Sequence, residues 1–181
     1  MRIISGKYKG HKLVSFDQDH IRPTTDRVKE SLFNIIAARI PEARVLDLFS
    51  GTGNLGLEAL SRGANSVDMV ELSRKSIDVI RKNMANLKVT EGIVIHKEDA
   101  VEFVQNYVGP AFDVVLIDPP FPAQICLKTL EALERSPAVS AATSIVIEHS
   151  RHEVLPEKIG ALRRVDSRSY GDKLLAFFER E

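Results

Sequence analysis

Residues 45–56 read VLDLFSGTGNLG, a short apolar run that leads into three glycines with the spacing G-x-G-x-x-G. Gly51, Gly53 and Gly56 allow a tight turn and let a ligand approach the backbone without meeting a Cβ atom. In α/β sheets, such sites lie outside the carboxyl ends of the strands. The stretch predicts a strand, a ligand-binding loop and a helix, and its spacing alone also permits a dinucleotide dehydrogenase.

From Arg44 onward, short apolar runs alternate with stretches of helical periodicity. The predicted strands are Val45–Phe49, Val67–Glu71, Ile93–His96, Phe112–Asp118, Ser144–Glu148, Leu162–Tyr170 and Leu174–Glu179. The predicted helices are Asn54–Ser61, Arg74–Leu87, Ala100–Tyr107 and Ala123–Arg135. Strand–helix alternation predicts a parallel sheet covered on both faces, and the last two strands, which no helix separates, predict an antiparallel pair at one edge. The expected fold class is therefore α/β, a Rossmann-like, doubly wound, seven-stranded sheet.

The N-terminal stretch has a different pattern. Apolar runs at 2–4 and 11–14 surround glycine-containing turns and predict a β-hairpin. A polar loop follows and ends in Arg22-Pro23, after which Val28, Leu32, Ile35 and Ile36 recur at helical spacing, with Thr24 or Thr25 as the expected N-cap. We therefore divide the chain into a hairpin and basic arm, residues 1–23, and a main domain, residues 24–181.

The net charge of zero hides a gradient along the chain. Residues 1–44 carry nine Lys or Arg against five Asp or Glu, and the remainder carries sixteen against twenty. A basic arm on a neutral body favours contact with a polyanion, although a solvated hairpin of no special role is an equally open interpretation. The residues expected to contact RNA are Arg2, Lys7, Lys9, Lys12, Arg22 and Arg27.

Acidic residues near three strand ends narrow the choice of cofactor. Asp47, four residues before Gly51, suits a cationic amino group and would repel a pyrophosphate. Glu71 ends the second strand and can accept the ribose hydroxyls of an adenosine, and Asp99 is placed to meet the adenine amino group. Structural alternatives remain open, because Asp47 could cap a turn, Glu71 could be a solvated strand end and Asp99 is a natural helix N-cap.

The pattern predicts a nucleoside cofactor that carries a cationic amino group. The residues expected to bind it are Asp47, Phe49, Gly51, Gly53, Glu71, Asp99 and Ala100.

The fourth predicted strand ends in Asp118-Pro119-Pro120-Phe121, which we interpret as the catalytic motif. The amino group of a nucleic-acid base is a poor nucleophile, because its lone pair is delocalised into the ring. Asp118 and the Pro119 carbonyl can accept its two N–H groups, which orients the lone pair and stabilises the developing positive charge. Pro120 stiffens the loop and Phe121 can stack on the base. A rigid Pro-Pro turn is the structural alternative.

The residues quoted so far resemble the amino-methyltransferases of the seven-stranded class. The N-terminal motifs, RIISG at 2–6, GHKL at 10–13 and RPTTDRVKESLFN at 22–34, are similar to the bacterial family that methylates guanine N2 in small-subunit (16S) ribosomal RNA. The resemblance covers nearly the whole chain. It implies a seven-stranded sheet, S-adenosylmethionine as cofactor, ribosomal RNA within a small-subunit particle as partner, and an N-terminal hairpin that helps to hold RNA.

Other classes fit less well. A DNA adenine-N6 methyltransferase shares the acid-Pro-Pro-aromatic logic but normally needs a larger target-recognition region. An NAD-dependent oxidoreductase needs a hydride-transfer site that the sequence does not display, and the motif at Asp118 argues against a non-catalytic RNA-binding module. Metal-ligand spacings and long apolar runs are absent, and Cys126 is the only cysteine, so we expect no metal, no membrane contact and a cytoplasmic location.

Overall fold

The computed structural model describes residues 1–16, 26–120 and 125–181. Within these ranges the helices are α1 (Asp26–Ile35), α2 (Asn54–Ser61), α3 (Arg74–Asn86), α4 (Ala100–Asn106), α5 (Ile125–Arg135) and the 3-10 turn η1 (Ala37–Arg39). The strands are β1 (Arg44–Leu48), β2 (Ser66–Val70), β3 (Ile93–His96), β4 (Val114–Ile117), β5 (Ser144–Ser150), β6 (Lys158–Ile159), β7 (Leu162–Tyr170) and β8 (Lys173–Arg180). These elements confirm the predicted order of strands and helices to within a few residues at each end.

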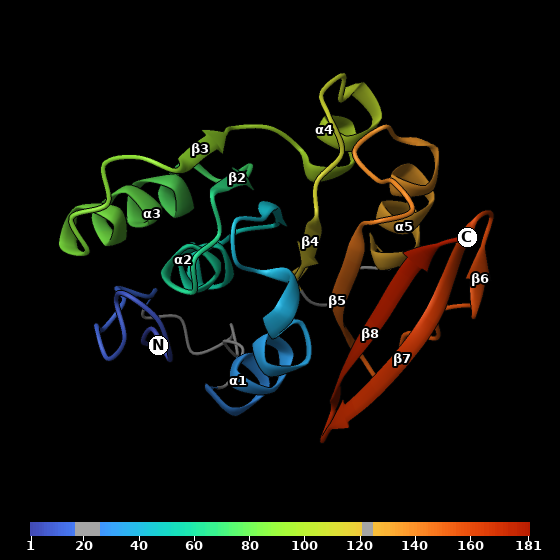
Figure 1. Ribbon diagram of the computed structural model, residues 1–181, viewed down its shortest axis with the longest axis horizontal. Coiled ribbons are helices and arrows are strands. Elements are labelled where there is room, and N and C mark those ends of the chain that lie inside the picture. The colour runs from blue at the N-terminus through green and yellow to red at the C-terminus, as the bar shows by residue number, and fades with distance from the viewer. Residues whose placement is uncertain (17–25, 121–124) are drawn as a thin grey trace.

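The strands form one sheet in the order β3-β2-β1-β4-β5-β8-β7-β6 (Figure 1). Strands β1 to β5 are parallel, whereas β8 pairs antiparallel with both β5 and β7. The order reverses between β1 and β4, and this is the switch point at which ligands bind in doubly wound sheets. We refer to the end of the sheet where β1 to β5 terminate as the carboxyl edge.

Helices cover both faces of the sheet and bury two apolar cores (Figure 1). On one face, α1, α2 and α3 pack over side chains such as Val45, Met69 and Leu116. On the other, α4 and α5 pack over their strand neighbours, for example Leu46 and Ile117. Because both faces are covered, every residue of β4 and β5 is buried, as expected of central parallel strands.

The C-terminal aromatic pair is part of this packing. Phe177 and Phe178 are neighbours on β8 and therefore point to opposite faces, where each is at least 96% buried in a different core. Their apolar character, which departs from the polar aromatic expected of the family, is explained by this burial on both sides of the sheet.

Three features differ from the sequence-based expectations. The sheet has eight strands in the described part of the chain rather than seven, because two-residue β6 pairs with the start of β7. Ile35, expected on the helical stripe with Ile36, is 43% exposed where α1 gives way to η1. The N-terminal hairpin is reduced to a single antiparallel bridge between Arg2 and Lys12, without regular strands. The expected N-caps Thr24 and Thr25 lie outside the described residues.

Residues 1–14, which we call the N-terminal arm, pack against the main domain. Ile3 and Leu13 are buried in the core formed with α1, α2 and α3. Backbone hydrogen bonds close the arm on itself, from Ile3 N to His11 O and from Gly10 N to Ile3 O, each 2.9 Å long. The division at residue 23 stays a prediction, but the described part of the arm shares its apolar core with the rest of the molecule.

Candidate cofactor and catalytic site

The glycine loop between β1 and α2 turns through left-handed backbone conformations. Phe49, Gly51 and Gly53 have φ values of 60°, 56° and 78°. A positive φ is costly for a bulky residue such as Phe49, and strained residues of this kind cluster at functional sites. At Gly51, an added Cβ would have only Phe49 O, 3.9 Å away, within 4 Å, so this part of the loop leaves room for a ligand to approach the backbone.

The third glycine of the motif has a packing role. An added Cβ at Gly56 would lie 2.5 Å from the Met69 side chain and 2.8 Å from Asp47 Oδ2. Only a residue without a side chain fits here, because α2 packs directly on β1 and β2. This matches the role of the third glycine in the G-x-G-x-x-G pattern, which is close approach of helix and strand.

Asp47 is buried on β1, with 1% of its surface exposed, and turns toward the start of α2. Gly56 N donates to its Oδ2 at 2.9 Å, so the Asp47 side chain holds the first turn of α2, directly after the left-handed part of the glycine loop. Burial is the largest cause that raises the pKa of Asp47 to about 8; the hydrogen bond from Gly56 opposes this shift, and the charges of Asp118 and Glu71 add to it. The turn-capping alternative is therefore present in the structure, and a contact with cofactor stays a prediction.

Glu71 follows β2 and ties two loops together. Its carboxylate accepts Gly51 N at 2.8 Å and Ser73 N at 2.8 Å. The first bond joins Glu71 directly to the glycine loop, twenty residues earlier in the chain. The Glu71 side chain is half-buried at the carboxyl edge. Its two hydrogen bonds hold it beside the loop, so it is not an unattached strand end.

Asp99 forms the N-cap of α4, as its structural alternative predicted. Its Oδ1 accepts Val101 N at 2.9 Å and Glu102 N at 3.1 Å. Ala100, the first residue of the helix, is buried. Both residues follow β3 at the carboxyl edge, and the capping bonds fix the backbone on which an adenine contact would depend.

Asp118 lies immediately beyond β4, next to the glycine loop. The pairing of Leu48 with Ile117 brings the ends of β1 and β4 side by side, so Phe49 and Asp118 leave the sheet as neighbours. Asp118 and Pro119 are half-buried and Pro120 is exposed. Phe121 lies outside the described residues, so its predicted stacking role is not placed by the structure.

The structure thus brings three of the predicted acids to one place. The charges of Asp118 and Glu71 each raise the pKa of Asp47, so each of these two carboxylates acts on the buried acid of β1. Like charges at one edge are mutually unfavourable, and a cationic ligand would relieve that repulsion. The site is therefore electrostatically suited to a small molecule with positive charge beside the β1–β4 switch point.

Sequence reasoning missed the buried ion pairs that hold the N-terminal arm. Lys29 Nζ lies 3.2 Å from Glu58 Oε2, and both side chains are at least 99% buried. Glu58 also accepts Ile4 N at 2.8 Å and Ser5 N at 3.0 Å from the arm. Burial lowers the pKa of Lys29, and Glu58 opposes that shift. The signal available in the sequence was a single acid, Glu58, in the otherwise apolar helix of residues 54–61.

Asn83 connects the arm to the glycine loop itself. This fully buried side chain on α3 donates to Val14 O at 3.1 Å and to Thr52 O at 3.0 Å, and it accepts Val14 N at 2.7 Å. Lys29 Nζ donates to Asn54 Oδ1 at 2.8 Å on the other side of the loop. No sequence signal distinguished Asn83 from an ordinary polar residue of a surface helix.

Four of the predicted RNA-binding residues are exposed on the N-terminal arm. Lys7, Lys9 and Lys12 are exposed, and Lys7 lies over the Tyr8 ring at 5.3 Å from its centroid. Arg2 is exposed too, but it donates to Asp26 at 2.9 Å. Arg27 is exposed on the first turn of α1, and Arg22 lies outside the described residues. Four of the six predicted bases therefore belong to one exposed segment.

Comparison with known proteins places the chain among close relatives. The family model described as Conserved hypothetical protein 95 matches residues 1–179. The Bacillus subtilis protein YlbH is 34% identical over 182 residues, 99% of each chain. Ribosomal RNA small subunit methyltransferase D of Escherichia coli is 38% identical over 86% of this chain and 78% of its own. The solved structure of yhhF from Escherichia coli has a TM-score of 0.88 at 32% identity and covers 100% of this chain and 98% of its own.

Proposed function

The chain belongs to the family described as Conserved hypothetical protein 95, and on this premise we propose that it transfers a methyl group from S-adenosylmethionine to the exocyclic N2 amino group of a guanine in small-subunit ribosomal RNA. One observation carries the proposal furthest. Asp118-Pro119-Pro120 leaves β4 directly beside the glycine loop, where β1 and β4 pair in parallel. A group held by Asp118 is therefore a neighbour of a ligand held by that loop.

The residues at the carboxyl edge fit S-adenosylmethionine. Gly51 leaves its backbone open to a ligand, and Glu71, held by the loop, is placed for ribose hydroxyls. The charges of Glu71 and Asp118 near the buried Asp47 favour a cation, and this cofactor carries a sulfonium and an ammonium group. Asp99 and Ala100 would meet the adenine, and Phe49 would line the loop. When bound, the cofactor supplies an electrophilic methyl group.

The chain's own residues prepare the nucleophile. Asp118 accepts one N–H of the guanine amino group and the Pro119 carbonyl accepts the other, which directs the nitrogen lone pair toward the cofactor loop. As positive charge develops on nitrogen, the Asp118 carboxylate stabilises it. Pro120 limits the freedom of the loop, and Phe121 would stack on the base. The proton leaves after transfer, so Asp118 does not need to be a strong base.

The proposal assigns the partner as ribosomal RNA, bound within a small-subunit particle in the cytoplasm. The exposed bases of the arm support contact with a polyanion. Among the described residues, no helix combines the length and apolar character that a membrane crossing needs. The arm's hydrogen bonds to α1, α2 and α3 would hold these bases in a fixed position relative to the cofactor loop.

Mapping the modified nucleotide by mass spectrometry tests the proposal. Small-subunit particles from a strain that lacks the enzyme would be incubated with the purified protein and S-adenosylmethionine, and the ribosomal RNA would then be digested. We expect one methyl group at the N2 position of one guanosine. Methylation of adenine in duplex DNA, with none in the particles, would contradict the substrate assignment.

A further inference from the structure

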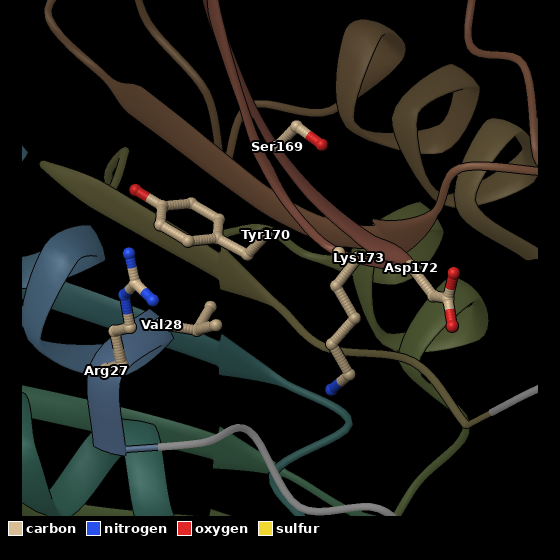
Figure 2. A pocket seen from close by; sticks show the side chains of 7 residues that line it. Arg27, Val28, Ser169, Tyr170, Asp172 and Lys173 are labelled. Carbon is tan, nitrogen blue, oxygen red and sulfur yellow. The ribbon is translucent and has the colours of Figure 1, made fainter.

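A pocket lies at the same edge of the sheet as the catalytic motif. This pocket of about 440 Å³ opens between the first turn of α1 and the tight turn that joins β7 to β8 (Figure 2). A volume in this range suits a small ligand or one nucleotide unit. The lining residues are Arg27, Val28, Ser169, Tyr170, Gly171, Asp172 and Lys173.

The sheet register places this pocket at the carboxyl edge. Lys173, the first residue of β8, pairs with Ser150 at the end of β5, so the β7–β8 turn lies at the same edge as the glycine loop. Lys173 Nζ donates to the carboxylate of Glu148, and Glu148 follows Ile147, the partner of Ile117. Because adjacent strands lie about 4.8 Å apart, β8 is about 10 Å from β4. The pocket is thus a neighbour of the Asp118 site and separate from it.

The pocket presents an available cation. Arg27 is exposed and makes no hydrogen bond or ion pair with any residue in ranges 1–16, 26–120 and 125–181. Asp172, the only acid among the described residues that line the pocket, is 3.3 Å from Arg151, which offsets its charge. Lys173, which Glu148 holds in place, adds a second cation at the wall of the pocket. A planar guanidinium with free N–H groups is the side chain best matched to a phosphate.

An aromatic ring faces the same space. Figure 2 shows Tyr170 on the hairpin opposite Arg27 and Val28 on α1. The Tyr170 hydroxyl is hydrogen-bonded to Ser31 Oγ, which fixes the ring against α1. Gly171 has a φ of +64° and would meet nothing within 4 Å if it carried a Cβ, so the turn leaves the space in front of it open. A fixed ring beside a cation is the arrangement that single-stranded nucleic acids use for base stacking and phosphate binding.

We propose that this pocket binds the nucleotide next to the target guanosine, with its phosphate on Arg27 and its base against Tyr170. The inference rests on the proposed function, because a pocket two strands from Asp118 is placed for a neighbouring nucleotide rather than for the one that reacts. Lys173 remains paired with Glu148, so Arg27 is the cation that contacts the phosphate. In this arrangement the β7–β8 turn and α1 hold the RNA strand while the target base is presented to Asp118.

The test measures binding of small-subunit ribosomal RNA and methyl transfer for the wild-type protein and four variants. Arg27→Gln removes the charge and Tyr170→Leu removes the ring. Tyr170→Phe keeps the ring without the bond to Ser31. Arg135→Gln is the matched control, an exposed arginine in the last turn of α5 at the opposite edge of the sheet.

We expect Arg27→Gln to reduce the slope of log affinity against log salt by about 0.7–0.9, the value of one lost phosphate contact. Tyr170→Leu should weaken RNA binding at least about fivefold, the lower end of base–aromatic stacking. KM for RNA should rise in both while kcat and cofactor affinity stay unchanged. Tyr170→Phe keeps the stacking surface and should weaken binding less than Tyr170→Leu, and Arg135→Gln should behave like the wild type. If Tyr170→Leu loses thermal stability, the RNA affinity and the salt slope of Arg27→Gln alone test the inference.

The outcomes separate this inference from the proposed function. If Arg27→Gln matches Arg135→Gln in affinity and salt slope while the wild type methylates the RNA, the pocket assignment is wrong and the proposed function stands. If the wild type binds RNA through Arg27 and Tyr170 but transfers no methyl group, the proposed function is wrong and the pocket assignment stands. A wild-type protein that does not bind the RNA contradicts both.

Discussion

At the scale of single residues, the candidate site is organised by carboxylates that serve the protein backbone. Glu71 accepts the Gly51 and Ser73 amides, and Asp47 accepts the Gly56 amide. These bonds shape the glycine loop before any ligand arrives. A substitution at either acid therefore changes both the conformation of the loop and the charge beside it. Amide variants of these acids separate the two effects.

Replacing Glu71 with Ala should weaken S-adenosylmethionine binding by about 1.5–3 kcal/mol, the usual range for losing hydrogen bonds to a charged group. Glu71→Gln retains an acceptor for one loop amide and should lose less. Isothermal titration calorimetry measures both, with Glu91→Ala as the control because Glu91 is an exposed acid on another loop. An unchanged dissociation constant in Glu71→Ala would remove Glu71 from the cofactor site.

Asp47 predicts a pH dependence of stability. Its pKa is about 8 in the folded protein and 3.8 as an unperturbed group, so between these pH values the folded chain holds a proton that the unfolded chain has lost. Stability from this group is therefore full below about pH 4 and is lost as pH rises toward 8, at up to about 1.4 kcal/mol per pH unit. Asp47→Asn cannot ionise and still offers an oxygen to Gly56 N.

Urea denaturation between pH 5 and 8.5 should accordingly show a shallower fall in unfolding free energy for Asp47→Asn than for the wild type. Glu91→Gln provides the matched control and should follow the wild-type curve. Parallel curves for Asp47→Asn and the wild type would mean that Asp47 is ionised in the folded protein throughout this range.

At the scale of elements, the N-terminal arm is attached to helices α1, α2 and α3, which pack around the glycine loop. Glu58 on α2 holds its backbone, and Asn83 on α3 joins Val14 to Thr52 in the loop. Breaking a buried pair such as Lys29–Glu58 leaves an uncompensated charge, which is strongly destabilising. The arm therefore presents its exposed lysines from a fixed base, as an RNA-binding element requires.

Replacing Lys7, Lys9 and Lys12 with Ala should lower RNA affinity and reduce the salt slope by about one to three units of log affinity per log salt. Cofactor affinity should not change, because these side chains are exposed and face away from the loop contacts. The control replaces Lys82, Lys128 and Arg135, three exposed bases on α3 and α5. Wild-type methylation of particles at every salt concentration would reduce the arm to a structural role.

At the scale of the whole molecule, the local sequence pattern predicted the sheet and the composition of the site, because both depend on short-range features. The apolar runs at 45–48 and 114–117 became neighbouring strands, and the acids that follow parallel strands met at one edge. Residues on α1 and the β7–β8 turn form the pocket across about 140 positions of sequence, and such contacts leave no periodic signal. The Lys29–Glu58 pair was missed for the same reason, whereas β6, which pairs with the start of neighbouring β7, has only two residues and shows no strand pattern.

We propose that Asp118 orients and stabilises the reacting amino group. Tritiated methyl incorporation into small-subunit particles from a strain that lacks the enzyme tests this role. We expect Asp118→Ala to fold, to bind S-adenosylmethionine nearly as the wild type does, and to lose transfer by about 10²–10³. Asp118→Asn should lose less, because its carbonyl oxygen still accepts a hydrogen bond. Near-wild-type turnover in Asp118→Ala would contradict the account and return the Pro-Pro turn to a structural role.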